Sequence, residues 1–528
     1  MKSNNMIEKN MDAVTRELAQ FNDLRSSITS DGNELYVGRL LQRAARLFPD
    51  RIALIHQDIQ LTYQELYLRA CRTSALLQER GVKIADRVVL CCENSIEFYV
   101  AYYGIWQLGA VVVPLNTFLR SAELAHILAD ANPVCVVTSL EFKTLFESAG
   151  VAMPPVLMTD ELPMHGATDT SWDQNIQYEL DRNQMAALLY TSGTTGMPKG
   201  VMLSSKAIMT NIMQSIIRLD FSKQERVFGV LPLFHAFAQF ACVWAPLFVG
   251  ACVILVSKIE RRFIIAGFEH KPTIVLGVPA LFGLFCLMKT VPFDSVKYCI
   301  SGGDALSDKI RAYFGLLYRR RIASGYGLTE TCPVLSFTIE DEAMSTGTVG
   351  YLLAGIASSV RNEQAVEVPY GSIGELWVKC DNLMLGYYND VQATNKVIQD
   401  GWFNTGDLVY FDEKGRLVIS GRTKDLLIHK GFNIYPQEVE NVIMSHPNVL
   451  NVGVVGKLDH DVGDVPIAYV QLRTADQKCA QQLKQLCQEH LAAYKVPKMF
   501  VCDTKPLPTT ATGKVDKKQL RKLVQELK

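Results

Sequence analysis

The chain has 528 residues, which is too long for one compact core and predicts at least two domains. Hydrophobic residues make up 48% of it and charged residues 20%, a balance typical of a folded protein and not of a disordered one. The formal net charge of −1 excludes the strongly basic footprint of nucleic-acid binding and of electrostatic attachment to an anionic membrane.

The thirteen cysteines are scattered and form no C-x-x-C pair, so we expect a reduced, cytoplasmic chain without a disulfide framework or a zinc site. The polar N-terminus predicts no secretory signal. Residues 228–256 are nearly all apolar, but two prolines, a glycine, His235 and Gln239 interrupt them. A buried helix at 236–248 followed by a strand at 252–256 is favoured over a membrane span.

From residue 36 to 138 the pattern alternates between helix and strand. Helices are predicted at 40–48, from a Thr62 cap to just before Gly81, at 97–107 and at 123–130, and strands at 87–92, 111–114 and 134–138. Strands are predicted again at 274–278 and 296–300. Alternation of this kind predicts βαβ units and largely parallel sheets, an α/β fold class.

Beyond residue 401 the pattern changes to a β-hairpin around Asp412–Gly415 and then to a compact α+β region. We expect helices at 436–445 and 478–490, strands at 449–455 and 466–472, and a basic final helix. A short polar run at 422–425 separates the two regions. The predicted organisation is a large domain at 1–421, a hinge at 422–425 and a small C-terminal domain at 426–528.

The stretch Thr191–Gly200 contains ten loop-type residues with a single charge, Lys199, between two apolar runs. Its glycines allow close approach of the backbone to a ligand, and its hydroxyls and amides are donors suited to phosphate. It is not a Walker A loop, because Met-Pro-Lys follows Gly196. A plain polar hairpin is the alternative interpretation.

Four more stretches carry groups suited to a nucleotide. Ser301–Asp304 follows a predicted strand, and Ser324–Glu330 places Tyr326 between two glycines, where it can stack on a planar base. Asp407 suits ribose hydroxyls, and Glu330 suits a hard cation such as magnesium. Lys514 lies on a loop far along the chain. Taken singly, Asp407 and Lys514 are better explained by a turn and a solvated surface, and Glu330 is evenly balanced; the joint occurrence of these residues favours a site.

These motifs give the chain its resemblance to the adenylate-forming superfamily, which includes acyl-CoA synthetases, adenylation domains and firefly-type luciferases. The resemblance covers about residues 36–523 and rests on TSGTTGMPKG, SGYGLTET, GWFNTGDL, GRTKDLLIHKGFNIYPQEVE and the TGK ending. It implies a large domain of layered α/β sheets with a β-barrel-like subdomain, and a small α+β domain that turns between two half-reactions. In the first, a carboxylate and ATP form acyl-adenylate and pyrophosphate; in the second, a thiol, usually that of coenzyme A, displaces AMP.

The resemblance also implies roles for individual residues. The phosphates would be held by Thr191, Ser192, Gly193, Thr194, Thr195, Gly196 and Lys199. The remaining nucleotide contacts would come from Gly302, Gly303, Asp304, Tyr326, Thr329, Asp407 and Arg422. Glu330, with Thr191, would hold magnesium; Lys514 would stabilise the charge of adenylation; Lys424 would be the hinge; and Lys430 and Gly431 would line the coenzyme A channel. Relatives commonly carry alanine where this chain has Asp304.

The residues around His235 bear on the substrate. Amino-acid-activating relatives carry an aspartate at this position, so His235 in an apolar neighbourhood disfavours α-amino acids and is interpreted as a gate or orienting group. Six apolar side chains either line an acyl tunnel or belong to the core: Phe234, Phe237, Phe240, Val243, Trp244 and Phe248.

We expect a fatty acid CoA ligase that uses ATP, magnesium and coenzyme A, with an aryl acid as the alternative substrate. The alternative functions are loading of a carrier protein, light emission by an oxygenase, and an inactive scaffold. The apolar side chains at the entrance of the expected acyl site also allow peripheral contact with the inner face of a membrane.

Overall fold

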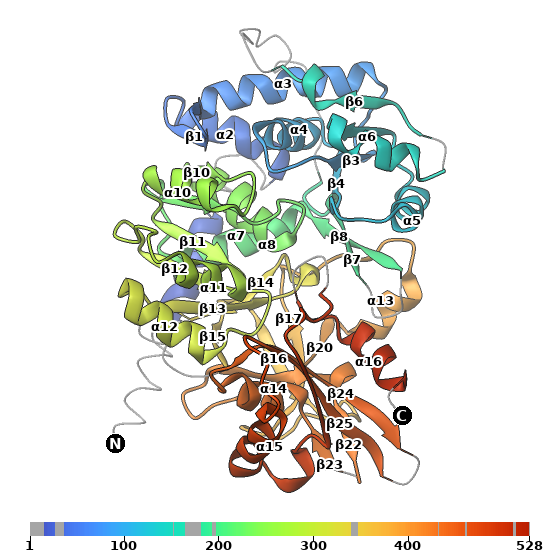
Figure 1. The fold of residues 1–528 in the computed structure, drawn as a ribbon. Coiled ribbons are helices and arrows are strands. Elements are labelled where there is room, and N and C mark those ends of the chain that lie inside the picture. The colour runs from blue at the N-terminus through green and yellow to red at the C-terminus, as the bar shows by residue number, and fades with distance from the viewer. Residues whose placement is uncertain are drawn as a thin grey trace.

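The computed structural model describes residues 15–26, 36–150, 153–163, 181–192, 197–338, 347–430, 432–459, 462–509 and 514–526. Several residues with predicted roles lie outside this part of the chain, namely Gly193, Thr194, Thr195, Gly196 and Gly431, together with the side chain of Ser192. The architecture is mixed α/β, with a large N-terminal domain and a smaller C-terminal domain, as predicted (Figure 1).

The first sheet of the large domain has the order β18-β8-β7-β4-β3-β5-β6. Its strands β3 to β6 are parallel, and β3, β4 and β5 are almost fully buried, which explains their continuous Val, Leu and Cys runs. The strands are β3 (Arg87–Cys91), β4 (Val111–Pro114), β5 (Cys135–Thr138), β6 (Val156–Met158), β7 (Met185–Ser192), β8 (Pro198–Ser204) and β18 (Gly386–Tyr387). The two runs that flank the glycine-rich stretch therefore form an antiparallel pair, β7 and β8.

Helices surround these strands where the sequence predicts them. Thr62 caps α3 through a capping box with Glu65, and Ser95 caps α4. Helix α4 is buried on nearly every face, because its residues are apolar all round. The longer helices of the large domain are α2 (Leu40–Leu47), α3 (Tyr63–Glu79), α4 (Ile96–Gln107), α5 (Ser121–Ala131), α6 (Leu140–Glu147), α7 (Ser205–Leu219), α10 (Arg261–Glu269), α11 (Pro279–Met288), α12 (Asp308–Tyr318) and α13 (Val391–Val397).

The second sheet is 14-stranded and changes character along its length. Strands β1, β10, β9, β11, β12 and β13 are parallel, whereas the strands from β13 to β21, without β18, pair antiparallel and form the β-rich subdomain. Its strands are β1 (Ile52–His56), β2 (Ile59–Thr62), β9 (Arg226–Gly229), β10 (Cys252–Leu255), β11 (Ile274–Gly277), β12 (Tyr298–Ser301), β13 (Ile322–Gly327), β14 (Val334–Phe337), β15 (Thr348–Leu352), β16 (Ala357–Arg361), β17 (Gly374–Lys379), β19 (Ile398–Gln399), β20 (Trp402–Phe411) and β21 (Leu417–Arg422).

The C-terminal domain has its own sheet, its own apolar clusters and three helices. The strands are β22 (Leu427–His429), β23 (Phe432–Ile434), β24 (Val449–Asp459), β25 (Gly463–Leu472) and β26 (Met499–Asp503), and the helices are α14 (Pro436–Met444), α15 (Cys479–His490) and α16 (Lys517–Glu526). In Figure 1 this domain lies below the large domain. The predicted hinge falls between β21 and β22, at a single turn of 3₁₀-helix, Thr423–Asp425; its motion stays a prediction.

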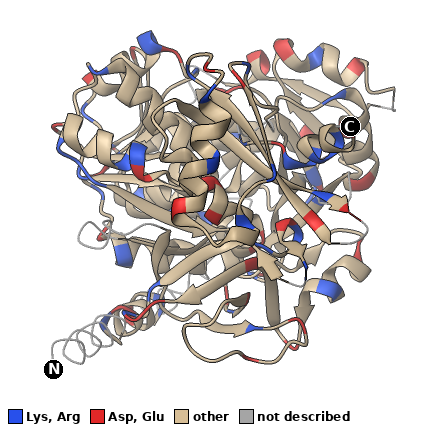
Figure 2. Cartoon of the chain, turned by 60° about the horizontal axis from the view of Figure 1, so that its bottom comes forward, with Lys and Arg blue, Asp and Glu red and all other residues tan. Residues whose placement is uncertain are grey.

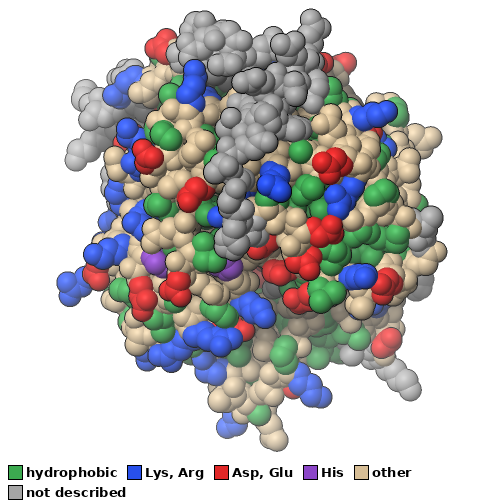
Figure 3. Space-filling model, turned by 90° about the horizontal axis from the view of Figure 1, so that it is seen from above, with side chains coloured by type: hydrophobic (Ala, Val, Ile, Leu, Met, Phe, Trp, Pro, Cys, Tyr) green, Lys and Arg blue, Asp and Glu red, His purple; other side chains and the backbone are tan. Residues whose placement is uncertain are grey.

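The apolar stretch 228–256 is built into the large domain as predicted, and β10 lies inside the second sheet. In the part of the chain that the structure describes, no helix combines the length and the apolar character that crossing a membrane requires. None of the thirteen cysteines, all of which lie in the described part of the chain, forms a disulfide. Figures 2 and 3 show cations and anions interspersed over the faces in view, in keeping with the balanced net charge.

Candidate active site

The predicted site residues converge where the strands of the second sheet end and the C-terminal domain approaches. Tyr326 lies on β13, Asp407 on β20 and Arg422 at the end of β21. The pairing of β20 with β21 places Asp407 directly opposite Arg422. Strand order therefore brings together groups that are nearly a hundred residues apart in the chain.

Asp407 is the centre of a hydrogen-bonded group. It is 2% exposed, its Oδ1 accepts from Arg422 Nε at 3.0 Å, and its Oδ2 accepts from the Tyr326 hydroxyl at 2.6 Å. The Asp407 carboxylate raises the pKa of Arg422, while burial and then this carboxylate raise the pKa of Tyr326 well above its usual value. The Asp407 carboxylate is thus held in a fixed orientation at the site, with a permanent cation beside it.

The two glycines flanking Tyr326 allow the backbone to come close to its neighbours. A Cβ atom at Gly327 would lie 1.8 Å from the Pro333 carbonyl oxygen, so no other residue fits there. Gly302, at the end of β12, would place a Cβ 3.2 Å from the ring of Phe237. The close neighbours of Gly327 and Gly302 are thus atoms of the protein itself, and adenine stacking by Tyr326 and the contacts of Gly303 and Asp304 stay predictions. Asp304 itself is exposed and accepts from the Ala305 amide.

Glu330 lies in a 3₁₀ turn, Thr329–Thr331, which also carries Thr329. Asn382 Nδ2 donates to the Thr331 carbonyl oxygen at 2.7 Å, and the Tyr387 hydroxyl donates to Glu330 Oε1 at 2.9 Å. Burial raises the pKa of Glu330, and a backbone hydrogen bond to its carboxylate and then the Tyr387 hydrogen bond oppose that rise. A single hard carboxylate held in place fits magnesium, which takes one or two protein carboxylates and fills its other positions with phosphate oxygens and water.

Lys199 lies on β8 opposite Thr191 on β7. Its Nζ atom is 3.4 Å from Asp390 Oδ2 and 5.3 Å from the centre of the Tyr387 ring. Sequence reasoning missed both Tyr387 and Asp390. The available signal was the run Gly386–Asp390, in which aromatic residues follow a glycine as they do around Tyr326.

Lys514 reaches the same site from the C-terminal domain. Burial lowers the pKa of Lys514, and the nearby charges of Asp304, Arg422 and Asp407 act on it as well. Lys424 has a pKa lowered by burial and then by Arg422, and its carbonyl oxygen accepts from Arg521 of α16. The structure thus brings Lys514 to Asp304, Arg422 and Asp407, three of the residues predicted to bind the nucleotide. Lys430, an exposed residue of the C-terminal domain, makes no hydrogen bond or ion pair with the described residues of the site.

His235 precedes the short helix α8 (Ala236–Ala238) and faces the site. Burial, together with the charge of Lys514, lowers its pKa to about 4. Its Nε2 atom is buried and has no hydrogen-bond partner among the described residues. A neutral imidazole that lies in reach of Lys514 suits the predicted orienting role and does not act as a cation at neutral pH.

We expect an NMR titration of the imidazole resonances to find His235 neutral throughout pH 5.5–8, because its ionisation is displaced to about pH 4. The His235→Gln variant assigns the resonance among the nine histidines. Because the pKa of His235 is lower in the folded protein than in the unfolded chain, protonation of its imidazole favours unfolding. His235 therefore lowers the free energy of unfolding as pH falls from about 6.5 towards 4. A midpoint of the His235 imidazole titration near pH 6.5 would contradict the burial of this side chain.

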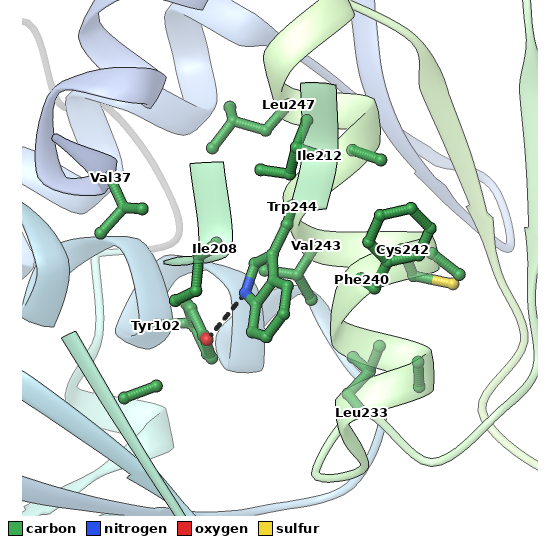
Figure 4. Packing of buried hydrophobic residues seen from close by; sticks show 14 of the residues in the cluster. Val37, Tyr102, Ile208, Ile212, Leu233, Phe240, Cys242, Val243, Trp244 and Leu247 are labelled. Atoms are coloured by element: carbon green, nitrogen blue, oxygen red, sulfur yellow. Dashed lines mark hydrogen bonds between the residues drawn. The ribbon is translucent and has the colours of Figure 1, made fainter. Parts of the chain in front are cut away.

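Of the six side chains for which the sequence left an acyl tunnel and the core open, four belong to the core. Val243 and Trp244 are 0% exposed, Phe240 and Phe248 are 4% and 5% exposed, and all four belong to the main apolar cluster. Trp244 Nε1 donates to the Tyr102 hydroxyl at 2.9 Å, and Val37, Ile208 and Leu247 pack around it (Figure 4). A π-helical segment, Gln239–Trp244, leads into α9 (Ala245–Val249) and turns these side chains into the core. Only Phe234 and Phe237 stay half-buried beside His235.

Comparison with known proteins agrees with this geometry. A model of the AMP-binding enzyme family matches residues 41–388, and a model of its C-terminal domain matches residues 438–514. The chain belongs to the AMP-binding enzyme family, whose members form adenylates.

Similar curated proteins include the long-chain-fatty-acid–CoA ligase of Bacillus subtilis, 30% identical over 91% of this chain and 93% of that protein. A 2-succinylbenzoate–CoA ligase of Bacillus mycoides is 32% identical over 92% and 98%. Among solved structures, O-succinylbenzoate coenzyme A synthetase of Bacillus subtilis with ATP and magnesium has a TM-score of 0.82 at 30% identity, covering 92% of this chain and 99% of that one. An anthranilate CoA ligase, 24% identical, shares the fold with a TM-score of 0.86 over 94% and 99%.

Proposed function

We propose that the protein is an ATP-dependent ligase that joins an apolar monocarboxylic acid to coenzyme A, with a fatty acid as the preferred substrate. The observation that carries the proposal is the meeting of Lys514 from the C-terminal domain with Asp407, Arg422 and Tyr326 of the large domain. A cation delivered by a second domain is what a reaction between two anions requires, because a carboxylate and a polyphosphate repel each other.

In the first step, an oxygen of the acid attacks the α-phosphorus of ATP, the bond to the β-phosphate breaks, and pyrophosphate leaves. Asp407 and Arg422 bind the ribose hydroxyls, Tyr326 covers the adenine, and Lys199 with the Thr191 hydroxyl faces the departing phosphates. Lys514 lies between the carboxylate and the α-phosphate, where it stabilises charge as the new bond forms. Glu330 would hold magnesium, which when bound neutralises phosphate charge.

In the second step, the sulfur of coenzyme A attacks the acyl carbon, the acyl–phosphate bond breaks, and AMP leaves while the thiol proton passes to solvent. Lys514 has no task in this step. We infer that the C-terminal domain turns about Thr423–Asp425 and presents the face that carries Lys430 and Gly431 to the thiol.

The acyl side of the site favours an uncharged acyl group. Phe234 and Phe237 border it, His235 is neutral, and the nearby segment 236–249 contains no charged residue. Nothing in that segment would pair with a second carboxylate or an ammonium group. Since Val243 and Trp244 have no space beside them, we propose a short or medium chain, with an aromatic acid as the second candidate because Phe237 faces the glycine surface at Gly302.

A panel of acids tests this proposal. Each acid is supplied with ATP, magnesium and coenzyme A, and pyrophosphate, AMP and the thioester are measured. We expect thioester formation with saturated acids of short or medium chain, a decline at long chains, and little turnover of amino acids or dicarboxylic acids. The reason is that the first group brings only apolar atoms beside Phe234, Phe237 and the neutral His235, whereas the others leave a charge unpaired.

Two results would contradict the substrate class. Turnover restricted to dicarboxylic or amino acids would mean that a charged partner has been overlooked. A rate that rises steadily with chain length to long fatty acids would mean that the packing around Trp244 opens when substrate binds.

A further inference from the structure

The segment 384–390 bridges the two places where the ATP phosphates are expected to bind. The Met384 amide donates to the Glu330 carbonyl oxygen at 2.8 Å, the Leu385 amide to the Met202 carbonyl at 2.9 Å, and the Tyr388 amide to the Gly200 carbonyl at 2.7 Å. Its strand β18 pairs with β8, which carries Lys199. One short stretch of backbone therefore fixes the Glu330 turn relative to the strand of the phosphate lysine.

Two side chains of this segment touch the phosphate-site groups themselves. The Tyr387 hydroxyl donates to Glu330 Oε1 at 2.9 Å, while the face of its ring lies 5.3 Å from Lys199 Nζ. Asp390 Oδ2 lies 3.4 Å from Lys199 Nζ, and its Oδ1 accepts from the Ala393 amide at 2.8 Å, which caps α13. Tyr387 thus contacts an expected metal ligand and the phosphate lysine at the same time.

The geometry points to two positioning residues with separate tasks. We propose that Tyr387 orients the Glu330 carboxylate for the metal, and that Asp390 holds Lys199 as a counter-ion which ATP must displace. This inference rests on the proposed ATP site and extends it to residues outside the motifs that identified the family.

The two tasks predict opposite effects on nucleotide binding. A hydroxyl that donates to Oε1 fixes the plane of the carboxylate group, so its loss weakens the part of the ATP affinity that depends on metal. Asp390 competes with phosphate for one ammonium group, so its neutralisation strengthens ATP binding whether or not metal is present. A purely structural role for the segment would weaken both kinds of binding together.

Calorimetric titration of the full chain with ATP separates these effects. Binding is measured in excess magnesium and again in EDTA, and the ratio of the two dissociation constants gives the gain from metal. We expect Tyr387→Phe, which keeps the ring over Lys199, to reduce this gain about tenfold, the usual worth of a hydrogen bond to a charged group. Asp390→Asn, which can still cap α13, should tighten ATP binding about threefold in both conditions, as loss of an exposed ion pair implies.

Tyr388→Phe and Asp58→Asn are the matched controls, and we expect both to bind ATP like the wild type. The inference is overturned if Tyr387→Phe leaves the gain from metal unchanged, if Tyr388→Phe reduces it equally, or if Asp390→Asn weakens binding. These outcomes are independent of the proposed function. Binding that follows the prediction in a protein that forms no thioester would support the positioning roles and refute the ligase.

Discussion

We expect Lys514→Ala to slow acyl-adenylate formation by about 10²- to 10³-fold, the usual cost of removing one preorganised charge partner from a transition state. Lys514 comes from the C-terminal domain and lies near enough to Asp407 and Arg422 for their charges to act on it, and burial makes its ammonium charge hard to replace by solvent. The measurement is pyrophosphate release in a rapid-quench assay with acid and ATP.

The same variant should convert supplied acyl-adenylate and coenzyme A to thioester at nearly the wild-type rate, because the proposed second step does not use Lys514. Lys518→Ala, an exposed lysine of α16, is the control and should leave both steps unchanged. Equal loss of both half-reactions in Lys514→Ala would contradict the exchange of domain faces and would point to a general loss of structure.

The second large effect is expected for Glu330→Gln, which keeps the size of the side chain and removes its negative charge. We expect adenylation to fall by about 10²-fold or more, since a metal that neutralises transferring phosphate contributes several kcal/mol. The Tyr387 hydroxyl can still donate to the side-chain amide oxygen of this variant, so the turn at Thr329–Thr331 should keep its shape. The measurement is the adenylation rate as a function of magnesium concentration.

The concentration of magnesium that gives half the maximal rate should rise in this variant, and the thermal midpoint should stay equal to or above that of the wild type, because a buried charge has been removed. Glu363→Gln, at an exposed glutamate, serves as the control. An unchanged dependence of the adenylation rate on magnesium in Glu330→Gln would contradict the proposal that Glu330 holds magnesium at the phosphate site.

Much of the fold could be predicted because local signals and global packing agree. Thr62 and Glu65 form the capping box that begins α3, and the buried Val runs of β3, β4 and β5 could only be central parallel strands. The turn at Asp412–Gly415 joins β20 and β21, and this hairpin places Asp407 opposite Arg422. The site motifs were recognisable because each combines glycine with a polar group. The packing of a hydrophobic core does not require that combination, so it indicates a ligand site.

What the sequence left open also has physical causes. Trp244 and its neighbours are apolar whether they line a tunnel or fill a core, so their residue types do not distinguish the two. Trp244 is held in the core by a hydrogen bond to Tyr102, which is 142 positions away in the sequence. Tyr387 and Asp390 acquire their roles through the pairing of β18 with β8, a contact between strands nearly two hundred residues apart. Periodicity and spacing carry no information about such long-range partners.

The central claim is that two domains assemble one site which makes an acyl-adenylate and then passes the acyl group to coenzyme A. A single-turnover experiment with α-labelled ATP and a saturating medium-chain fatty acid tests it most directly. Without coenzyme A, labelled acyl-adenylate should accumulate to no more than one equivalent per enzyme. Adding coenzyme A should convert it to AMP and acyl-CoA in equal amounts. Acyl-adenylate that persists after coenzyme A is added would contradict the account and would assign the acyl group to a different acceptor.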